Sequence, residues 1–339
     1  MPPSPAALPH DLLRERANSR RRPKEPTAKV DDPAHFINRE LSLLEFNRRV
    51  LAQAKDESLP LLERLRFLTI STTNLDEFFE IRVAGLKQQE RFGVSQSGPD
   101  GMTAAEQLRA ISSVAHELVD EQYRYFNEAM IPALEEQGIR FLRRDQWKPE
   151  VRRWVQEHFR REVLPVLTPV GLDPAHPFPR PLNKSLNFIC SLSGTDAFGR
   201  ESEFAVVQAP RSLPRLVRLP EPLAERPNDF VFLSSIIHAN VDDLFPGVKV
   251  NGCFQFRLTR NSDLWVDEEE VDDLLNALED ELLRRQHGDA VRLEVADNCP
   301  EELYEFLLEQ FELAPPDLYR VNGPVNLYRV GSVYDLVDR

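Results

Sequence analysis

Residues 60–79 read Pro60-Leu-Leu-Glu-Arg-Leu-Arg-Phe-Leu-Thr-Ile-Ser-Thr-Thr-Asn-Leu-Asp-Glu-Phe-Phe79, and this stretch decides the fold of the first third of the chain. Its apolar residues recur every three or four positions, which is the spacing of one helix face. Pro60 suits the start of a helix, because proline is tolerated in the first turn. Thr72-Thr73-Asn74 is a polar cluster suited to capping a helix N-terminus, so we expect a further helix to begin there.

The flanking sequence continues the helical pattern in both directions. An apolar stripe with the same spacing precedes the quoted stretch. Downstream, Thr103 and Glu106 have the spacing of a capping box, and the helical period continues from there to Gly138. Pro132 is expected to kink the last turn of this long helix. The sequence therefore predicts an amino-terminal helical bundle over residues 34–137.

After this point the helical period gives way to alternation of apolar and polar residues, which is typical of strands. Residues 164–181 hold six prolines and are expected to be extended. Because single helices interrupt strands at hairpin-like spacing, we expect a mixed α+β domain over residues 138–314, with a mainly antiparallel sheet. The expected strands are 139–141, 186–192, 204–208, 254–258 and 291–295, and the expected helices are 151–163, 271–282 and 300–311.

The two ends of the chain differ from its middle. Residues 1–33 are rich in proline and arginine and predict a disordered arm. A transit peptide, or an arm that binds anionic polymers such as nucleic acid, is the alternative for this segment. Residues 315–339 are too few for a domain, and we expect them to open a further, truncated domain. The predicted fold class is thus an α+β multidomain protein.

Composition excludes several classes of protein. The 339 residues carry 42 Lys and Arg against 56 Asp and Glu, which gives a formal net charge of −14. This balance argues against a general nucleic-acid binder, which needs a broadly basic surface, but leaves a local basic funnel open. We expect no specific nucleic-acid partner. Three cysteines without a C-x-x-C spacing indicate a reducing compartment and no zinc site. No apolar run approaches the roughly 20 residues of a membrane span, and we expect a cytoplasmic protein.

Signatures of catalysis are scarce in the sequence. It holds no P-loop, no dinucleotide-binding glycine pattern, no zinc-protease motif and no nucleophile elbow. The seven histidines are scattered, and the most unusual one, His176, lies in a proline-rich loop that explains it without chemistry. The acidic run at 267–273 lies in the first turns of a predicted helix, where carboxylates favour the positive end of the macrodipole. We interpret it as a solvated helix start rather than a metal site.

Basic residues near the quoted stretch allow two interpretations. Arg64 and Arg66, with Arg82 and Lys87 further on, have the chemistry to line an anion path, because the guanidinium fork grips phosphate oxygens. Ion pairs with neighbouring carboxylates explain the same residues equally well. Those carboxylates are Glu63, Asp76, Glu77 and Glu80.

Several separated motifs together resemble one family. Phe36-Ile-Asn-Arg-Glu-Leu-Ser-Leu-Leu-Glu-Phe-Asn47 and the stretch at 60–79 resemble the amino-terminal helical domain of the large bacterial ATP-dependent polyphosphate kinases. Val163-Leu-Pro-Val-Leu-Thr-Pro169 and Asp173-Pro-Ala-His-Pro-Phe-Pro179 are similar to their second, so-called head domain. Leu318-Tyr-Arg-Val-Asn-Gly-Pro-Val-Asn326 is similar to the entry into their first catalytic domain. The resemblance runs from about residue 35 to the end.

This resemblance implies reversible transfer of the ATP γ-phosphate to polyphosphate, through a phosphohistidine and with Mg²⁺. In that family the phosphorylated histidine and the Mg²⁺-binding residues lie in two carboxy-terminal domains, and no histidine of this chain matches the nucleophile. We therefore assign no catalytic residue and no metal ligand here, and expect this chain alone to be inactive. The resemblance also implies ATP, ADP and polyphosphate as ligands and a homo-oligomer formed through the head domain, with peripheral membrane association as an alternative for the full-length enzyme.

One family role falls on a residue of this chain. In the family, the Asn before Leu-Asp-Glu-Phe contacts the adenine of ATP, and that position is Asn74. A carboxamide offers both a donor and an acceptor to the adenine edge. The alternative role for Asn74 is the helix cap described above, whereas Asp76 and Glu77 are interpreted as structural. A non-catalytic scaffold that binds polyphosphate or a protein partner is the alternative function.

Overall fold

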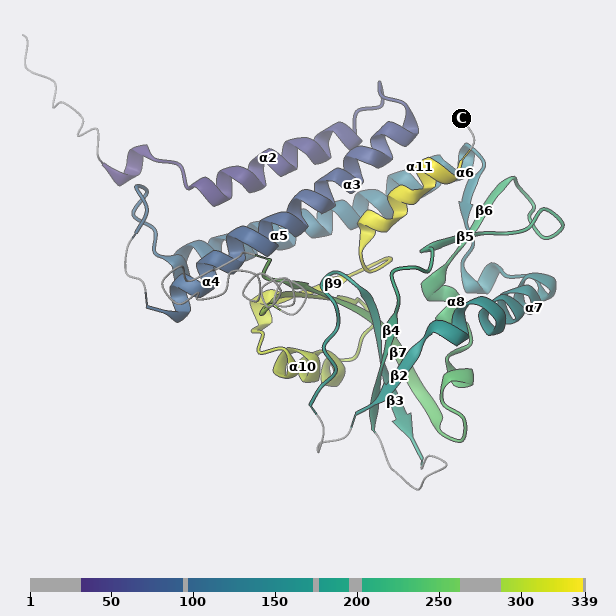
Figure 1. Ribbon diagram of the computed structural model, residues 1–339. Coiled ribbons are helices and arrows are strands. Elements are labelled where there is room, and N and C mark those ends of the chain that lie inside the picture. The colour runs from purple at the N-terminus through teal and green to yellow at the C-terminus, as the bar shows by residue number, and fades with distance from the viewer. Residues whose placement is uncertain (1–31, 94–96, 173–176, 195–202, 263–287, 338–339) are drawn as a thin grey trace, which may run out of the picture.

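The computed structural model describes residues 32–93, 97–172, 177–194, 203–262 and 288–337. A layer of long helices lies against one end of a twisted sheet, and shorter helices cover the two faces of that sheet (Figure 1). Four of the sequence expectations lie outside the described residues. They are the arm, except for its last two residues, the helix at 271–282, the acidic run at 267–273 and His176.

The amino-terminal helical bundle is confirmed. Two of its long helices begin at a side-chain cap: the Oδ1 atom of Asn38 accepts hydrogen bonds from the first turn of one, and Thr103 and Glu106 form the predicted capping box of the other. A 3₁₀ turn, η1 (Pro33–His35), precedes the bundle. The helices are α2 (Arg39–Ala54), α3 (Leu61–Glu77), α4 (Ala84–Arg91), α5 (Ala104–Tyr125) and α6 (Ile131–Glu136).

The helix start predicted at Thr72-Thr73-Asn74 is wrong. Helix α3 continues past these residues into a π-helical turn, η2 (Phe78–Val83), and then into α4 without a break. The hydroxyl groups of Thr72 and Thr73 donate to the carbonyl oxygen of Thr69, at 2.8 and 3.0 Å, instead of capping a new helix. Asn74 therefore lies inside a helix, and its side chain is available for other contacts.

The disturbance expected at Pro132 takes the form of a second π-helical turn. Helix α5 passes through η3 (Phe126–Met130) before α6, which carries Pro132 in its first turn. Proline has no backbone N–H and its ring crowds the preceding turn, so a widened turn just before it removes the conflict. The helix ends as predicted at Gly138, which adopts a φ of 79°.

A six-stranded sheet forms the centre of the α+β region, with the strand order β2-β4-β3-β7-β8-β9. All neighbours are antiparallel except β8 and β9, so the predicted mainly antiparallel sheet is confirmed. The edge strands β2 and β9 were not predicted. The strands are β2 (Thr168–Gly171), β3 (Leu186–Ser193), β4 (Phe204–Ala209), β7 (Lys249–Arg260), β8 (Ala290–Ala296) and β9 (Leu318–Val321).

A second, three-stranded sheet joins the bundle to this region. Strand β1 (Ile139–Phe141), which follows α6, pairs in parallel with β6 (Asn228–Phe232), and β6 pairs antiparallel with β5 (Leu216–Arg218). Its central strand β6 contains Asp229, whose fully buried carboxylate accepts hydrogen bonds from Arg140 of β1, from Nε at 2.9 Å and from NH2 at 2.8 Å. This ion pair fixes β1 to β6.

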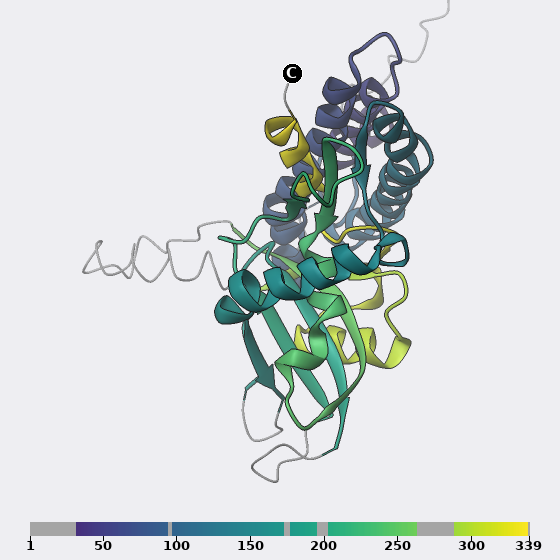
Figure 2. The same ribbon diagram turned by 90° about the vertical axis from the view of Figure 1, so that its right-hand side faces the viewer.

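Helices pack on both faces of the six-stranded sheet (Figure 2). Alternating residues of β3 face opposite cores: Phe188 packs with α7 and α8, and Ile189 packs with α10. The segment 164–181 is not extended throughout, because Pro165 lies in a 3₁₀ turn whose φ suits its ring. The elements are α7 (Pro149–His158), π-helical η5 (Phe159–Val163), η6 (Leu164–Val166), α8 (Leu233–Ala239), η7 (Val241–Leu244) and α10 (Glu301–Gln310).

The carboxy-terminal residues pack on both regions. After the 3₁₀ turn η8 (Pro315–Asp317), β9 extends the six-stranded sheet. The 3₁₀ turn η9 (Leu327–Ser332) and helix α11 (Val333–Leu336) then lie along α3, where their apolar residues share a core with the bundle (Figure 1). The bundle and the sheet therefore share one continuous hydrophobic core at this point.

Candidate functional site

A cluster of four buried charged residues lies where α3 meets the sheet. Both NH groups of Arg257 on β7 donate to the carboxylate of Asp76, at 2.9 and 2.8 Å, and Arg292 on β8 donates to it at 2.5 Å. The Nε atom of Arg257 also donates to Glu294. The four side chains are between 1% and 5% exposed. Two arginines and two carboxylates make the buried cluster neutral.

The electrostatics of this cluster fit a structural role. Burial alone would raise the pKa of Asp76, but the charges of Arg257 and Arg292 outweigh it, and the pKa lies below its usual value. The guanidinium of Arg292 also lies over the rings of Phe79 and Tyr319, at 4.6 and 5.6 Å from their centroids. Every charge is thus compensated within the protein, which supports the interpretation of Asp76 as structural.

Asn74 lies two residues away and lines a cavity of about 240 Å³. Its Nδ2 donates to Oδ1 of Asn47 at 3.3 Å, and Asn47 is itself held by a hydrogen bond to the carbonyl of Ser71 at 2.8 Å. The Oδ1 of Asn74 accepts no hydrogen bond from the described part of the chain. The cavity is lined by Leu43, Leu44, Phe46, Asn47, Asn74, Glu77, Phe78, Ile81 and Arg82.

This cavity has the composition of a site for a flat, polar ring. Phe46 is half exposed and offers an aromatic face, while Asn74 offers one free acceptor beside one donor. Small-molecule sites in proteins commonly combine apolar walls with a few placed polar groups. The sequence singled out Asn74, but the opposite wall comes from α2, which no local pattern connects to it, and the rest comes from Glu77 and the π-helical turn η2.

The four basic residues proposed for an anion path do not meet at one site. Arg64 donates to the hydroxyl of Tyr125, and Lys87 pairs with Asp317 at 2.6 Å. The alternative, ion pairs with Glu63, Asp76, Glu77 and Glu80, is also wrong, because the contacts of these basic residues are made with other partners. Arg82 lies 4.0 Å from Glu40, and Arg66 lies over the ring of Tyr334 at 5.2 Å from its centroid.

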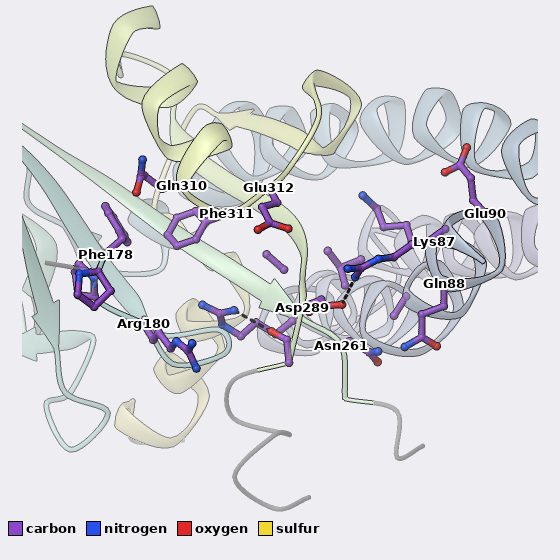
Figure 3. Close-up of a pocket in the computed structure, with 18 residues that line it drawn as sticks. Lys87, Gln88, Glu90, Phe178, Arg180, Asn261, Asp289, Gln310, Phe311 and Glu312 are labelled. Carbon is purple, nitrogen blue, oxygen red and sulfur yellow. Dashed lines mark hydrogen bonds and ion pairs between the residues drawn. The ribbon is translucent and has the colours of Figure 1, made fainter. Parts of the chain in front are cut away.

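A cleft of about 760 Å³ lies between α4 and the sheet (Figure 3). Its charges largely compensate one another: Arg91 pairs with Asp289 at 3.4 Å, and Glu90 and Glu312 line it as well. Arg260 donates at 2.9 Å to the carbonyl of residue 288. Sequence reasoning missed this cleft because its walls come from segments far apart in the chain.

Two further observations bear on the candidate chemistry. His116 stacks on Tyr319 with a centroid distance of 3.9 Å and lies within hydrogen-bond distance of two backbone carbonyls, which is a structural role.

Over the described ranges, no group of three or more His, Cys, Asp or Glu side chains is placed to hold a metal ion. No helix in those ranges is long and apolar enough to cross a membrane.

Comparison with known proteins shows that the chain matches two domains of one family. Residues 36–142 match the family model of the polyphosphate kinase N-terminal domain, and residues 150–333 match that of the polyphosphate kinase middle domain. The chain therefore belongs to the polyphosphate kinase family.

Individual relatives agree with this assignment. The chain is 57% identical over 307 residues to a polyphosphate kinase of Pseudomonas aeruginosa, covering 91% of this chain and 44% of the relative. It is 56% identical over 304 residues to one of Neisseria meningitidis, covering 90% and 44%. The crystal structure of polyphosphate kinase from Porphyromonas gingivalis superimposes with a TM-score of 0.69 at 25% identity, covering 90% of this chain and 41% of that one. The chain thus spans less than half the length of these relatives.

Proposed function

We propose that this chain is the amino-terminal part of a polyphosphate kinase that reversibly transfers the γ-phosphate of ATP to polyphosphate through a phosphohistidine. Support comes from the names of its relatives and from the matches to two of the family's domains. Mg²⁺ would neutralise phosphate charge in such a reaction. The described residues do not fit that ion, because they offer no cluster of metal ligands. We therefore assign the ion to no residue among them.

The role of this chain in the reaction is to contact the nucleotide base through Asn74. The observation that carries this proposal is the position of Asn74 on the wall of a cavity, with an unused acceptor atom and a neighbouring aromatic ring. The Oδ1 and Nδ2 atoms suit the donor and acceptor edge of adenine. The hydrogen bonds that hold Asn47 keep the carboxamide of Asn74 oriented before a nucleotide arrives.

Replacing Asn74 with alanine is expected to weaken ATP binding to this chain about three- to tenfold, the value of one lost hydrogen bond. Isothermal titration of the 339-residue chain with ATP measures the effect. The matched control is Gln53→Ala on α2, which removes an exposed carboxamide away from the cavity and leaves the affinity unchanged. Equal affinities for the wild type and Asn74→Ala would contradict the proposed contact.

This chain alone is expected to make no polyphosphate from ATP and Mg²⁺. None of its histidines matches the family nucleophile, and phosphoryl transfer needs a nucleophile together with cations placed around the transferred group. Gel analysis of the products after incubation with radiolabelled ATP is the measurement. ATP-dependent formation of a phosphate polymer by the 339 residues would overturn this view and would require a catalytic residue within them.

The remaining assignments follow from the same proposal. We divide the chain into an arm over residues 1–33, a helical domain over 34–137, a head domain over 138–314 and the opening of a catalytic domain over 315–339. The family models differ from these bounds, because the N-terminal model extends to residue 142 and the middle-domain model covers residues 150–333. We further propose a cytoplasmic homo-oligomer that associates through the head domain.

A further inference from the structure

Three arginines from two segments of the chain lie near the turn at Asn183 and Lys184: Arg211 and Arg215 from the connection between β4 and β5, and Arg329 from η9. Arg211, which follows β4, donates a hydrogen bond to the backbone carbonyl of Asn183. The side chain of Asn326 donates to the carbonyl of Lys184 at 3.3 Å, and the carbonyl of Asn326 accepts from the backbone N–H of Arg329 at 3.1 Å. Arg211 thus binds this turn directly, whereas Arg329 is linked to it through Asn326.

The third arginine, Arg215, lies directly before β5 and is more deeply buried. Burial, together with the positive charges of Arg329 and Arg211, lowers the pKa of Arg215 to about 10. Three cations that repel one another in a half-buried position destabilise the folded protein unless an anion lies between them. We call Arg211, Arg215 and Arg329 the arginine cluster.

No carboxylate of the described residues neutralises the arginine cluster. None of the three guanidinium groups forms an ion pair within those ranges, in contrast to Arg257 and Arg292. The NH1 atom of Arg215 and the Nε atom of Arg329 are buried and have no hydrogen-bond partner. Buried donors are nearly always satisfied in folded proteins, and an orphaned one is costly. We therefore expect a bound ligand to supply the acceptor for these two nitrogen atoms.

The backbone at this place is also held in an uncommon conformation. Lys184 has a φ of 55° and Asn326 a φ of 70°, and both lie in the left-handed region of backbone conformation that residues other than glycine rarely adopt. They contact each other through the hydrogen bond from the Asn326 side chain. Strain of this kind concentrates at ligand-binding places, where the surrounding structure maintains it.

We propose that the arginine cluster binds the phosphoryl oxygens of a linear phosphate chain. Guanidinium groups form bidentate, charge-assisted hydrogen bonds with phosphate oxygens, and their charge persists at neutral pH even with a lowered pKa. A chain of several phosphates has enough oxygens to accept from all three arginines at once. The choice of inorganic polyphosphate over other phosphate chains rests on the proposed function, whereas the need for an anion rests on the arginines alone.

Isothermal titration calorimetry of the 339-residue chain with inorganic polyphosphate measures the affinity of the site. Arg215→Gln and Arg329→Gln are each expected to weaken binding about tenfold or more, since a lost hydrogen bond to a charged group has that effect. The matched control is Arg153→Gln on α7, an exposed arginine 3.7 Å from Glu150, which should change the affinity less than twofold. The glutamine variants should also lower the dependence of binding on salt concentration.

Thermal unfolding without ligand separates this role from a structural one. Removing an uncompensated cation should leave the midpoint of Arg215→Gln unchanged or raise it, while polyphosphate should stabilise the wild type more than the variant. Equal polyphosphate affinities for the wild type, both cluster variants and the control would overturn the proposal. A lower midpoint of Arg215→Gln without ligand would also overturn it, because the arginine would then satisfy a partner of the protein itself.

Titration with ATP and with orthophosphate identifies the source of the phosphate. Tighter binding of ATP than of polyphosphate, weakened by Arg329→Gln but not by Asn74→Ala, would assign the cluster to the nucleotide's phosphates and overturn the polyphosphate assignment. If ATP binding proves independent of Asn74 while polyphosphate binding depends on the cluster, the nucleotide contact fails and this inference stands.

Discussion

Replacing Asp76 with asparagine should lower the free energy of unfolding by about 3–5 kcal/mol, the usual cost of removing one partner from a buried ion pair. The substitution keeps the size of the side chain but changes the net charge of the buried cluster from zero to plus one. Arg257 and Arg292 then remain buried with Glu294 as the one carboxylate among these residues. Urea unfolding followed by circular dichroism measures the change in midpoint.

The pH dependence of the same variant has a definite sign. The pKa of Asp76 is lowered in the folded protein, so its stabilising effect is complete above the ordinary pKa of about 4 and is lost as the pH falls further. The wild type and Asp76→Asn should therefore differ most near neutral pH and converge in acid. Asp120→Asn, an exposed position on α5, is the control and should change stability by no more than about 0.5 kcal/mol. A similar small change for Asp76→Asn would contradict the role of the cluster.

Replacing Asp229 with alanine should lower the free energy of unfolding by about 2–4 kcal/mol. Its buried carboxylate accepts from Arg140 through two nitrogens and from the backbone N–H groups of Glu225 and Arg226, at 2.9 and 3.2 Å. Alanine removes this acceptor from all of these donors, although the NH2 atom of Arg140 keeps its hydrogen bond to Glu225 at 2.9 Å, and it removes the ion pair between β1 and β6. Hydrogen exchange in the strand residues 228–232 should rise with the loss of global stability.

The control for this variant is Asp243→Asn, which breaks a surface pair with Arg160 at 3.0 Å. Surface ion pairs contribute up to about 1 kcal/mol, so the control should be much milder. If both substitutions had the same effect, the junction between β1 and β6 would depend on backbone pairing and packing rather than on the buried carboxylate.

Periodicity was sufficient to predict most of the long helices and the four inner strands of the six-stranded sheet, because each has an apolar face that packs on a core. It did not predict β5, β6 or α8. The helix start predicted at Thr72-Thr73-Asn74 was wrong, because a polar cluster of this kind has two possible roles. The threonine hydroxyls donate to a carbonyl of their own helix instead of capping a new one, so the helix continues. Periodicity also failed at β2 and β9, which are four-residue edge strands with one neighbour each and too short to show alternation.

The ion-pair cluster could not be predicted from the sequence. In the alternating pattern of β7, Arg257 lies between Phe256 and Leu258 and so points to the opposite face of the sheet. The alternating pattern therefore predicts that this face is exposed to solvent. In the structure, α3 covers this side chain instead, so Arg257 is one of the most buried charged residues. The position of Asn74 in a cavity likewise depends on α2, which is distant in sequence.

Helix α3 bears the cavity wall at Asn74 and the buried anchor at Asp76 within a single turn. The cluster ties this helix to β7 and β8, and the shared core adds apolar packing on the same side. A shift of α3 alone towards a bound base would pull two arginines away from their carboxylate. If α3 closes on the base that we propose Asn74 contacts, the bundle and the sheet must therefore move together as one rigid body.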